Sequence, residues 1–261
     1  MFNIRFAADY LLHRFKAKTR HGIHSPFVYH LVDKVIYDTQ PKKVYNEIEA
    51  TRNLLLSDDR LITVTDLGAG SHLNNNKQKK ISALAKNALK APKLAQLLYR
   101  LVADMQPKSI IELGTCLGVT TLYLQKAAPE AKVFTLEGCP QTASVANKQF
   151  EAHQLNNINL DVGNFDDTLL PIIDSLPQLD FVYVDGNHQK EATLRYFEWC
   201  LPKVHEGTLL IFDDIYWSEG MKEAWAQIKA HPQVTVTIDL FWIGLVYFKK
   251  GQAKEDFMVK V

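Results

Sequence analysis

The chain has 261 residues, of which 47% are hydrophobic and 23% charged. This composition is that of a globular protein long enough to bury a sizeable core, most simply as one domain with an N-terminal elaboration. Thirty basic and 29 acidic residues give a formal net charge of +1, so no global field attracts nucleic acid or a membrane. Three widely spaced cysteines argue against a disulfide framework or a zinc ribbon and favour a reducing cytoplasm.

The N-terminal stretch of about twenty residues is interrupted by Arg5, Asp9 and His13. It therefore has neither the apolar region of a signal peptide nor the length of apolar sequence that spans a bilayer. No apolar run elsewhere is long enough to cross a membrane. We expect a cytoplasmic protein with no transmembrane segment.

Residues 1–107 are predicted to form a mainly helical N-terminal extension or lid. Apolar positions recur at helical spacing in the first helix, at Ile4, Ala8, Leu11 and Phe15. The segment 81–105 is also predicted to be helical, interrupted near Pro92. The exception is a short strand with a glycine turn near residues 60–71, followed by the most loop-like stretch, residues 72–80.

A local cluster of basic side chains accompanies the first helix. Its members are Arg14, Lys16, Lys18, Arg20, His21 and His24. Three interpretations are open: a solvated face on a packing helix, which we favour; a lid that binds an anionic substrate; and weak attachment to a membrane surface. No acidic or cysteine partner lies near the two histidines, which argues against zinc.

From residue 108 onward, short β-branched runs alternate with amphipathic helical stretches, the pattern of a parallel sheet covered on both faces. The five strands are expected at residues 109–113, 132–137, 158–162, 180–185 and 208–213. Apolar residues at helical spacing mark helices between them, at Ala146, Phe150 and His153 and at Met221, Trp225 and Ile228.

The end of the chain breaks this rhythm. Residues 234–240 alternate strictly and continue into residues 242–248 without an intervening helix. Two strands with so short a connection must be antiparallel. The predicted fold is therefore α/β, with five parallel strands, a C-terminal antiparallel pair and helices on both faces, an unusual combination for a dinucleotide-binding Rossmann domain.

The most informative segment is the turn from Glu112 to Gly118, where an apolar strand ends in an acid and glycines begin a helix. Glycines there let a ligand approach the main chain and the helix N-terminus. A carboxylate at this place repels phosphate and suits a cationic or hydroxyl-rich ligand such as S-adenosylmethionine. The spacing of a phosphate-binding P-loop is missing.

A second glycine turn, Asp66 to Gly70, competes for the same role. No strand follows it closely, so we interpret it as a hairpin or lid turn. After Gly118, by contrast, a helix leads to a strand that ends at Glu137, which is 25 residues beyond Glu112. An acid at about this spacing accepts hydrogen bonds from ribose hydroxyls in dinucleotide folds.

Five motifs in order resemble those of small-molecule O-methyltransferases: IIELGTCLGVTTLYL, TLEG, GNFDDTLL, DFVYVDGNH and GTLLIFDDIYW. The resemblance covers residues 108–250. It implies a Rossmann-like class I methyltransferase similar to catechol O-methyltransferase-like enzymes and metal-dependent sugar O-methyltransferases, with residues 108–261 as the S-adenosylmethionine-binding domain. Residues 20–32, RHGIHSPFVYHLV, look like a segment of an uncharacterised bacterial branch of methyltransferases.

The resemblance implies a role for each matching position. Glu112 would lie near the methionine amino group, Glu137 would hold the ribose, and Asn164 would contact the adenine where these enzymes often carry Asp. Cys116 stands where many class I enzymes have the middle glycine. The full set of expected cofactor-binding residues is Glu112, Gly114, Thr115, Gly118, Glu137, Gly138, Asn164, Phe165 and Asp185.

The expected catalytic residues follow the fourth and fifth strands. Asp185 ends the fourth strand and His188 follows three residues later, while Asp213 and Asp214 end the fifth. An imidazole can accept a proton from a substrate hydroxyl near neutral pH, and carboxylates suit Mg²⁺ or another divalent cation. In the resembled enzymes, acids at the positions of Asp185, Asp213 and Asp214 bind the metal, while strand-end acids without a metal are also common in this fold.

The favoured function is methyl transfer from S-adenosylmethionine to a hydroxyl of a small-molecule acceptor. A nucleic-acid methyltransferase is the first alternative, although the chain lacks an N/D-P-P-Y motif and a broad basic surface. The second is a cofactor-binding module without catalysis. We expect no nucleic-acid partner, and a homodimer stays open.

Overall fold

The computed structural model describes residues 4–65 and 76–261, which form two compact units. One unit consists of residues 39–175, and the other combines residues up to 38 with residues 176–261. The boundary expected between residues 107 and 108 stays a prediction. Across the described residues, no helix has both the length and the apolar character that crossing a bilayer requires.

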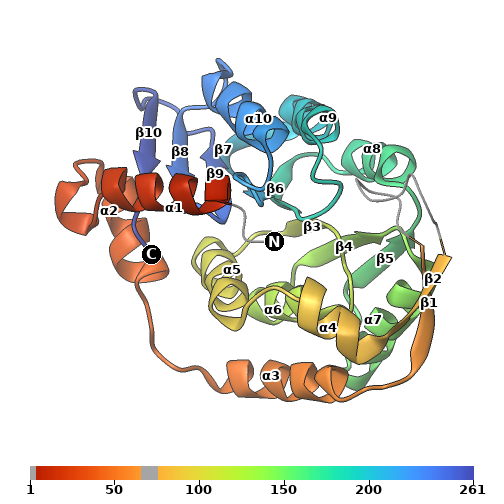
Figure 1. Ribbon diagram of the computed structural model, residues 1–261. Helices are drawn as coiled ribbons and strands as arrows, with labels where there is room; N and C mark the ends of the chain where they lie inside the picture. The colour runs from red at the N-terminus through yellow and green to blue at the C-terminus, as the bar shows by residue number, and fades with distance from the viewer. Residues whose placement is uncertain (1–3, 66–75) are drawn as a thin grey trace. The chain divides into compact units, whose positions relative to one another are not determined.

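The unit of residues 39–175 contains three parallel strands in the order β3, β4, β5 (Figure 1). They are β3 (Ser109–Leu113), β4 (Lys132–Glu137) and β5 (Ile158–Val162), each at its predicted bounds. Pairing places Glu112 opposite Thr135, and Glu137 opposite Val162. The carboxyl ends of the three strands therefore meet at one edge, where open α/β sheets bind ligands.

Helices bury the core of this unit. They are α3 (Lys43–Leu56), α4 (Ile81–Ala88), α5 (Pro92–Met105), α6 (Val119–Ala127), α7 (Pro140–Ala152) and α8 (Phe165–Ser175). The predicted interruption near Pro92 is the gap between α4 and α5, where proline occupies the first turn of the new helix. Ile48, Leu122, Tyr123 and Phe150 are among the buried side chains that join α3, α6 and α7.

A hairpin completes the unit. β1 (Leu61–Thr65) pairs antiparallel with β2 (Asn76–Lys80), with Leu61 opposite Lys80. The loop expected over residues 72–80 is therefore wrong for residues 76–80, because pairing with β1 recruits a polar stretch that has no strand signal of its own. The turn from Asp66 to Gly70 lies outside the described residues, while the strands that flank it pair as its interpretation as a hairpin requires.

The other unit contains β6 (Leu179–Val184), β7 (Val204–Asp213), β8 (Val236–Asp239), β9 (Ile243–Tyr247) and β10 (Glu255–Met258), in the order β10, β8, β9, β7, β6. β6 and β7 are parallel, and β9 is antiparallel to both β7 and β8. The predicted strands are thus all present, three of them parallel in one unit and two parallel in the other, where β8 and β9 form the predicted antiparallel pair. β10 was not expected, and it pairs parallel with β8.

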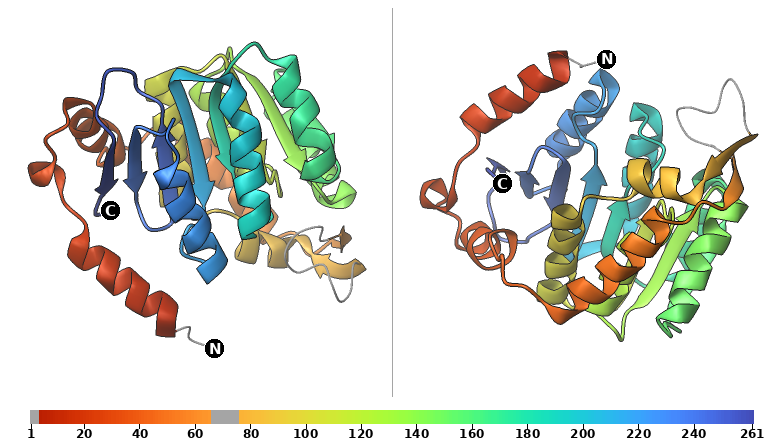
Figure 2. Two further views of the ribbon diagram at one scale, coloured as in Figure 1. Left: turned by 90° about the horizontal axis from the view of Figure 1, so that it is seen from above. Right: turned by 60° about the horizontal axis from the view of Figure 1, so that its bottom comes forward.

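The helices of this unit include α9 (Lys190–Cys200) and α10 (Glu219–Ala230), which lie side by side on one face of the strands (Figure 2, left). Ser218 caps α10 by accepting a hydrogen bond from the Met221 N–H at 3.1 Å. Shorter helical turns, η1 (Arg20–Gly22), α2 (Pro26–His30), η2 (Leu31–Ile36) and η3 (Leu201–Lys203), connect the longer elements.

The first helix, α1 (Ile4–Lys16), is confirmed, but the side by which it packs differs from expectation. Phe6, Tyr10 and His13 face inward and meet the ring of Phe241 edge-on, with centroid distances of 5.1, 5.0 and 5.5 Å. The apolar positions that indicated the helix, including Ile4 and Phe15, lie on its opposite, exposed side. Aromatic packing against the turn between β8 and β9 decides which face is buried.

Candidate functional site

The turn from Gly114 to Gly118 has an unusual backbone. Gly114, Cys116 and Gly118 all adopt positive φ, at 101°, 50° and 84°, a conformation that favours glycine. The N–H groups of Gly114 and Thr115 both donate to the carbonyl of Leu136, at 2.9 and 3.1 Å. The turn is therefore fixed against the end of β4.

Close packing is a second reason why residue 118 must be glycine, and the sequence did not indicate it. A Cβ atom there would lie 2.9 Å from Cε1 of Phe150 and 3.1 Å from Cβ of Ala146. The glycine thus lets the start of α6 approach α7 closely, in addition to permitting the positive φ. The expected cofactor contacts of Gly114, Thr115 and Gly118 stay predictions.

Glu112 is completely buried at the end of β3. Its Oε2 accepts hydrogen bonds from the Thr121 hydroxyl at 2.5 Å and the Thr135 hydroxyl at 2.7 Å. The hydroxyls of Thr115 and Thr135 are also 2.6 Å apart. Thr121 and Thr135 thus hold the carboxylate in place, and Thr115 supports Thr135. No role was assigned to Thr121 or Thr135 from the sequence, although both lie in the quoted motifs, because a threonine inside an apolar helix or strand resembles any other core residue.

Glu137 lies at the carboxyl end of β4, and both of its carboxylate oxygens bind backbone N–H groups. Oε2 accepts from Cys116 at 2.8 Å, and Oε1 accepts from Cys139 at 2.9 Å. The first bond ties the strand end directly to the glycine turn. An ionised carboxylate offers about four lone-pair sites, so Glu137 retains acceptor capacity for ribose hydroxyls. Its neighbour Gly138 is half-buried.

Asn164 caps the helix that follows β5. Its Oδ1 accepts from the Asp166 N–H at 3.1 Å, and its carbonyl accepts from the Thr168 hydroxyl at 3.0 Å. Asn164 is exposed, while Phe165 is half-buried at the first position of α8. The structure therefore gives the asparagine a capping role, and its contact with adenine stays a prediction.

In the other unit, three of the expected catalytic or metal-binding side chains converge. Nε2 of His188 lies 3.8 Å from Oδ1 of Asp185 and 3.9 Å from Oδ2 of Asp214. Asp185 directly follows β6 and Asp214 directly follows β7, two paired parallel strands. Asp214 has a positive φ of 53°, and Asn187, three residues after the end of β6, has a positive φ of 52°. The imidazole is therefore placed between two carboxylates at the strand ends.

Tyr183 was missed by sequence analysis and belongs to this group. Its hydroxyl lies 3.1 Å from Oδ2 of Asp185 and 3.2 Å from Oδ1 of Asp213. Asp213 is 1% exposed, so the phenol bridges a buried acid and the half-buried acid beside His188. In the sequence, Tyr183 is one of several apolar residues of a buried strand, which hides this role.

The donor set can be compared with what a divalent cation needs. Among residues 4–65 and 76–261, no group of three or more His, Cys, Asp or Glu side chains is arranged as a metal site. Mg²⁺, however, commonly takes only one or two carboxylates and keeps several waters. Oxygens of Asp185 and Asp214 face the same imidazole nitrogen, and this two-carboxylate set fits such a cation.

Asp214 forms main-chain hydrogen bonds with two tryptophans. The Trp217 N–H donates to the carbonyl of Asp214 at 2.9 Å, and the Asp214 N–H donates to the carbonyl of Trp242 at 2.8 Å. Trp217 is 61% exposed, so packing does not account for it. Tyr216, by contrast, stacks on Phe241 with ring centroids 4.7 Å apart and is a packing residue.

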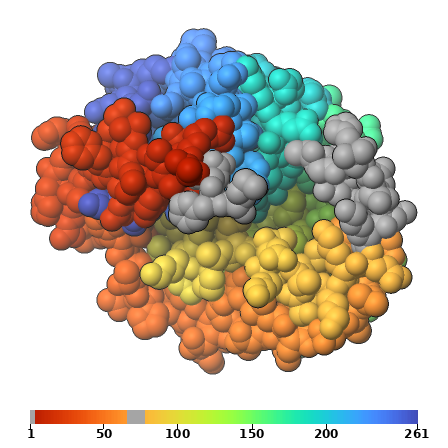
Figure 3. Space-filling model, in the orientation of Figure 1, coloured from red at the N-terminus to blue at the C-terminus, as the bar shows by residue number. Residues whose placement is uncertain are grey.

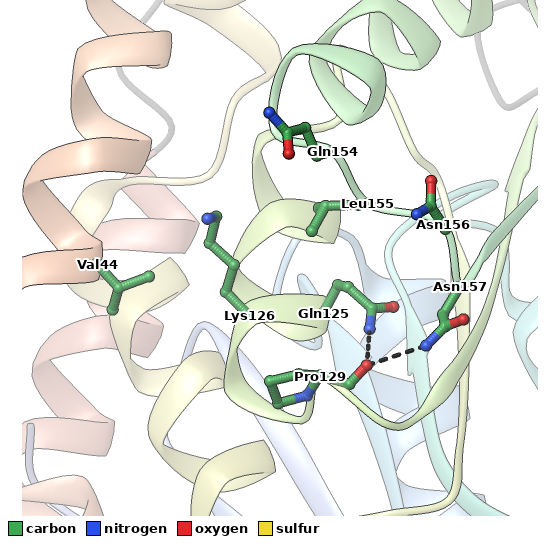
Figure 4. Close-up of a pocket in the computed structure, with 8 residues that line it drawn as sticks. All are labelled: Val44, Gln125, Lys126, Pro129, Gln154, Leu155, Asn156 and Asn157. Carbon is green, nitrogen blue, oxygen red and sulfur yellow. Dashed lines mark hydrogen bonds between the residues drawn. The ribbon is translucent and has the colours of Figure 1, made fainter.

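A separate hollow of about 500 Å³ lies in the unit of residues 39–175, near the amino end of β5 and away from the glycine turn (Figure 4). It is lined by residues that include Gln125 and Lys126 at the end of α6 and Asn157 directly before β5. The amides of Gln125 and Asn157 both donate to the carbonyl of Pro129, at 2.9 and 3.1 Å. None of the expected cofactor residues lines it.

The chain has the Rossmann-like α/β fold that class I methyltransferases share. Residues 111–215 match the model of a family described as a methyltransferase domain, which confirms the resemblance drawn from the motifs. An O-methyltransferase from Bacillus cereus, solved in complex with SAH, aligns with a TM-score of 0.57 and 20% identity, over 84% of this chain and 95% of that one. The predicted fold class is therefore confirmed.

Two curated relatives are catechol O-methyltransferases. The enzyme of Niastella koreensis is 30% identical over 135 residues, which are 48% of this chain and 57% of that protein. The enzyme of Mycobacterium tuberculosis is 27% identical over 150 residues, covering 52% of this chain and 64% of that protein. The chain thus spans less than two thirds of the length of both relatives.

Proposed function

We propose that this protein transfers a methyl group from S-adenosylmethionine to a hydroxyl of a small-molecule acceptor. The observation that carries the proposal is Glu137, whose carboxylate is fixed by the N–H groups of Cys116 and Cys139 at the rim of the glycine turn. A rigid acceptor pair beside a positive-φ turn suits ribose hydroxyls and repels phosphate. The names of the catechol O-methyltransferase relatives support a phenolic acceptor.

The proposed chemistry assigns the proton to His188. S-adenosylmethionine, when bound, supplies a methyl group that leaves its sulfonium as the bond to the acceptor oxygen forms. His188 takes the hydroxyl proton of the acceptor, and Asp185 and Asp214 stabilise the imidazolium that results. Tyr183 positions Asp185 through its hydrogen bond. Asp185 and Asp214 would hold Mg²⁺, which would supply a lower pKa of the acceptor hydroxyl when bound. Asp213 would support Asp185 through Tyr183.

A cytoplasmic location is part of the proposal. It is supported by Cys116, Cys139 and Cys200, all of which are free thiols. Burial raises the pKa of the Cys200 thiol to about 12, so this cysteine is held as an unreactive core residue. Light scattering on the purified protein tests whether it forms the homodimer that the sequence analysis considered.

Calorimetry with S-adenosylhomocysteine tests the cofactor site. The protein is expected to bind it, and Glu137→Ala is expected to weaken binding at least about tenfold, because hydrogen bonds to a charged acceptor are lost. Glu130→Ala is the matched control, since Glu130 is an exposed acid in the turn before β4. Absence of binding, or equal binding by Glu137→Ala and the wild type, contradicts the proposal.

Turnover is tested separately, with catechol as the acceptor and formation of S-adenosylhomocysteine as the readout. Binding without turnover over a panel of phenols would favour a cofactor-binding module. Salt-sensitive binding to RNA, together with methylation of that RNA, would favour a nucleic-acid methyltransferase.

A further inference from the structure

Helix α1 is apolar on the side that it turns away from the protein. At 100° per residue, Ile4, Leu11 and Phe15 share one face, and Leu12 borders it. These four residues, here named the outer stripe, are 81%, 68%, 89% and 51% exposed, respectively. Figure 3 shows the helix at the molecular surface. Scattered exposed leucines are common, whereas a continuous stripe of this kind marks an interaction surface.

The inward side of the same helix is already well held. Nε2 of His13 lies 3.0 Å from the buried carboxylate of Asp239, and Asp9 accepts from Nζ of Lys222 at 3.0 Å. Arg5 forms an ion pair with Glu219 at 2.9 Å. The helix is therefore anchored at its start, middle and end, and the outer stripe is presented on a fixed support.

Positive charge gathers where the outer stripe ends. No acidic residue occurs between Asp9 and Asp33, and Lys16 and Lys18 are exposed. Arg20 is paired with Asp33 at 2.6 Å, and Arg14 donates to the carbonyl of Val261 at 2.7 Å. Lys16 and Lys18 have no ion pair with any residue that the structure describes. The protein as a whole carries a net charge of only +1, so this positive region is local.

Charge complementarity distinguishes the possible occupants. Two copies meeting through their outer stripes would bring basic helices together, and the one acid of α1, Asp9, is engaged by Lys222. The helix of the second copy would therefore offer no free acid to Lys16 or Lys18. An anionic bilayer surface supplies both components, because acyl chains accept the apolar side chains and lipid phosphates attract the lysines.

We propose that α1 attaches this protein peripherally to a membrane surface that contains anionic lipids, with the outer stripe inserted between headgroups and with Lys16 and Lys18 at the phosphate level. A helix of 13 residues is about 20 Å long and lies in the interface rather than spanning it. One short amphipathic helix gives reversible attachment. This proposal does not depend on the identity of the methyl acceptor.

Co-sedimentation of the full chain with vesicles tests the proposal. Vesicles of phosphatidylcholine with phosphatidylserine are expected to bind the protein, and vesicles of phosphatidylcholine alone are expected to bind it more weakly. The double variant Leu11→Gln/Phe15→Gln should lose at least about tenfold in binding, because its apolar contacts are removed. Lys16→Gln/Lys18→Gln should lose about fivefold for each lysine.

Matched controls use equivalent residues elsewhere. Leu54→Gln removes a leucine of α3 that is 71% exposed, and Lys86→Gln removes an exposed lysine of α4; both should bind like the wild type. The proposal is overturned if the wild type stays in the supernatant with anionic vesicles, or if the α1 variants bind as it does. It is also overturned if light scattering shows a dimer that Phe15→Gln dissociates, since the stripe then binds a second copy.

Discussion

The imidazole of His13 and the carboxylate of Asp239 form a buried pair, with Nε2 and Oδ1 separated by 3.0 Å and each side chain at most 3% exposed. Asp239 also accepts from the Phe241 N–H, the Tyr216 hydroxyl and the Trp225 indole, at 2.9, 2.9 and 3.0 Å. One carboxylate thus joins α1, the loop after β7, α10 and the turn between β8 and β9.

We expect Asp239→Asn to lower the free energy of unfolding by about 2–3 kcal/mol, because the buried network loses its negative charge and an amide donor replaces one of its two acceptor oxygens. Urea denaturation followed by circular dichroism measures this change. Asp161→Asn, an exposed acid of β5, should change the free energy by less than about 0.5 kcal/mol. Equal stability of Asp239→Asn and the wild type would mean that the network contributes nothing net.

The same network predicts a pH dependence. Burial raises the pKa of Asp239, but the hydrogen bond and charge of His13, with the Phe241 N–H and the Tyr216 hydroxyl, outweigh it and hold the pKa below its usual value. A lowered folded-state pKa stabilises the protein above the unfolded value of about 3.9, and this contribution is lost as the pH falls through the folded pKa. The stability difference between wild type and Asp239→Asn should therefore shrink below about pH 4. A difference that stays constant there would contradict it.

Gly118→Ala should destabilise the protein by about 1–3 kcal/mol, through a strained positive φ and contact with the ring of Phe150. Gly251→Ala separates the two causes, since Gly251 also has a positive φ, of 71°, but a Cβ there would meet nothing within 4 Å. Thermal unfolding of both variants isolates the packing contribution. If both variants lose equal stability, close packing of α6 on α7 is not what requires the glycine.

The sequence predicted β3, β4 and β5 at their observed bounds because each is a short apolar or alternating run bordered by turn residues. It did not predict β10, because Phe257 is the one buried residue of that strand and gives no alternating pattern. The strand is defined by its pairing with β8. For α1, periodicity predicted the helix correctly. It could not show that the aromatic residues on the other face pack against Phe241 and leave the outer stripe exposed.

In the candidate site, too, some residues could be predicted from the sequence and others could not. Acids at strand ends are visible in the sequence, and Asp185, His188 and Asp214 do come together. The residues that hold the acids are not visible, because Thr135 reaches Glu112 only through the register of β3 on β4. Tyr183 likewise reaches Asp213 only because β6 pairs with β7. Register depends on tertiary packing, which a single sequence does not encode locally.

Removal of divalent cations is expected to lower turnover with catechol and leave binding of S-adenosylhomocysteine unchanged. The reason is that Asp185 and Asp214 would hold the cation, whereas Glu112 and Glu137 lie at the ends of other strands. Treatment with a chelator, followed by addition of Mg²⁺, measures both effects. Asp214→Asn should raise the Mg²⁺ concentration needed for half-maximal turnover. Full activity in chelator would remove the metal from the proposal.

His188→Ala should lower turnover by about 10²–10⁴-fold, the usual contribution of a general base, with little change in binding of S-adenosylhomocysteine. Asp185→Asn should act in the same direction. The chain offers a matched control in a second histidine–aspartate pair, His205 and Asp180, whose Nε2 and Oδ1 atoms are 3.0 Å apart. This pair lies near the amino ends of the same two strands, β7 and β6.

His205→Ala removes an imidazole from a carboxylate without touching the carboxyl ends of those strands, so it should keep wild-type turnover. Initial rates at saturating cofactor and calorimetric affinities for the three variants separate chemistry from folding. If His188→Ala and Asp185→Asn lose cofactor binding together with turnover, the pair supports the structure and does not transfer a proton. If His205→Ala is as inactive as His188→Ala, the loss of any histidine–aspartate pair in this unit is enough to abolish turnover. The low turnover of His188→Ala would then give no evidence for a catalytic role of His188.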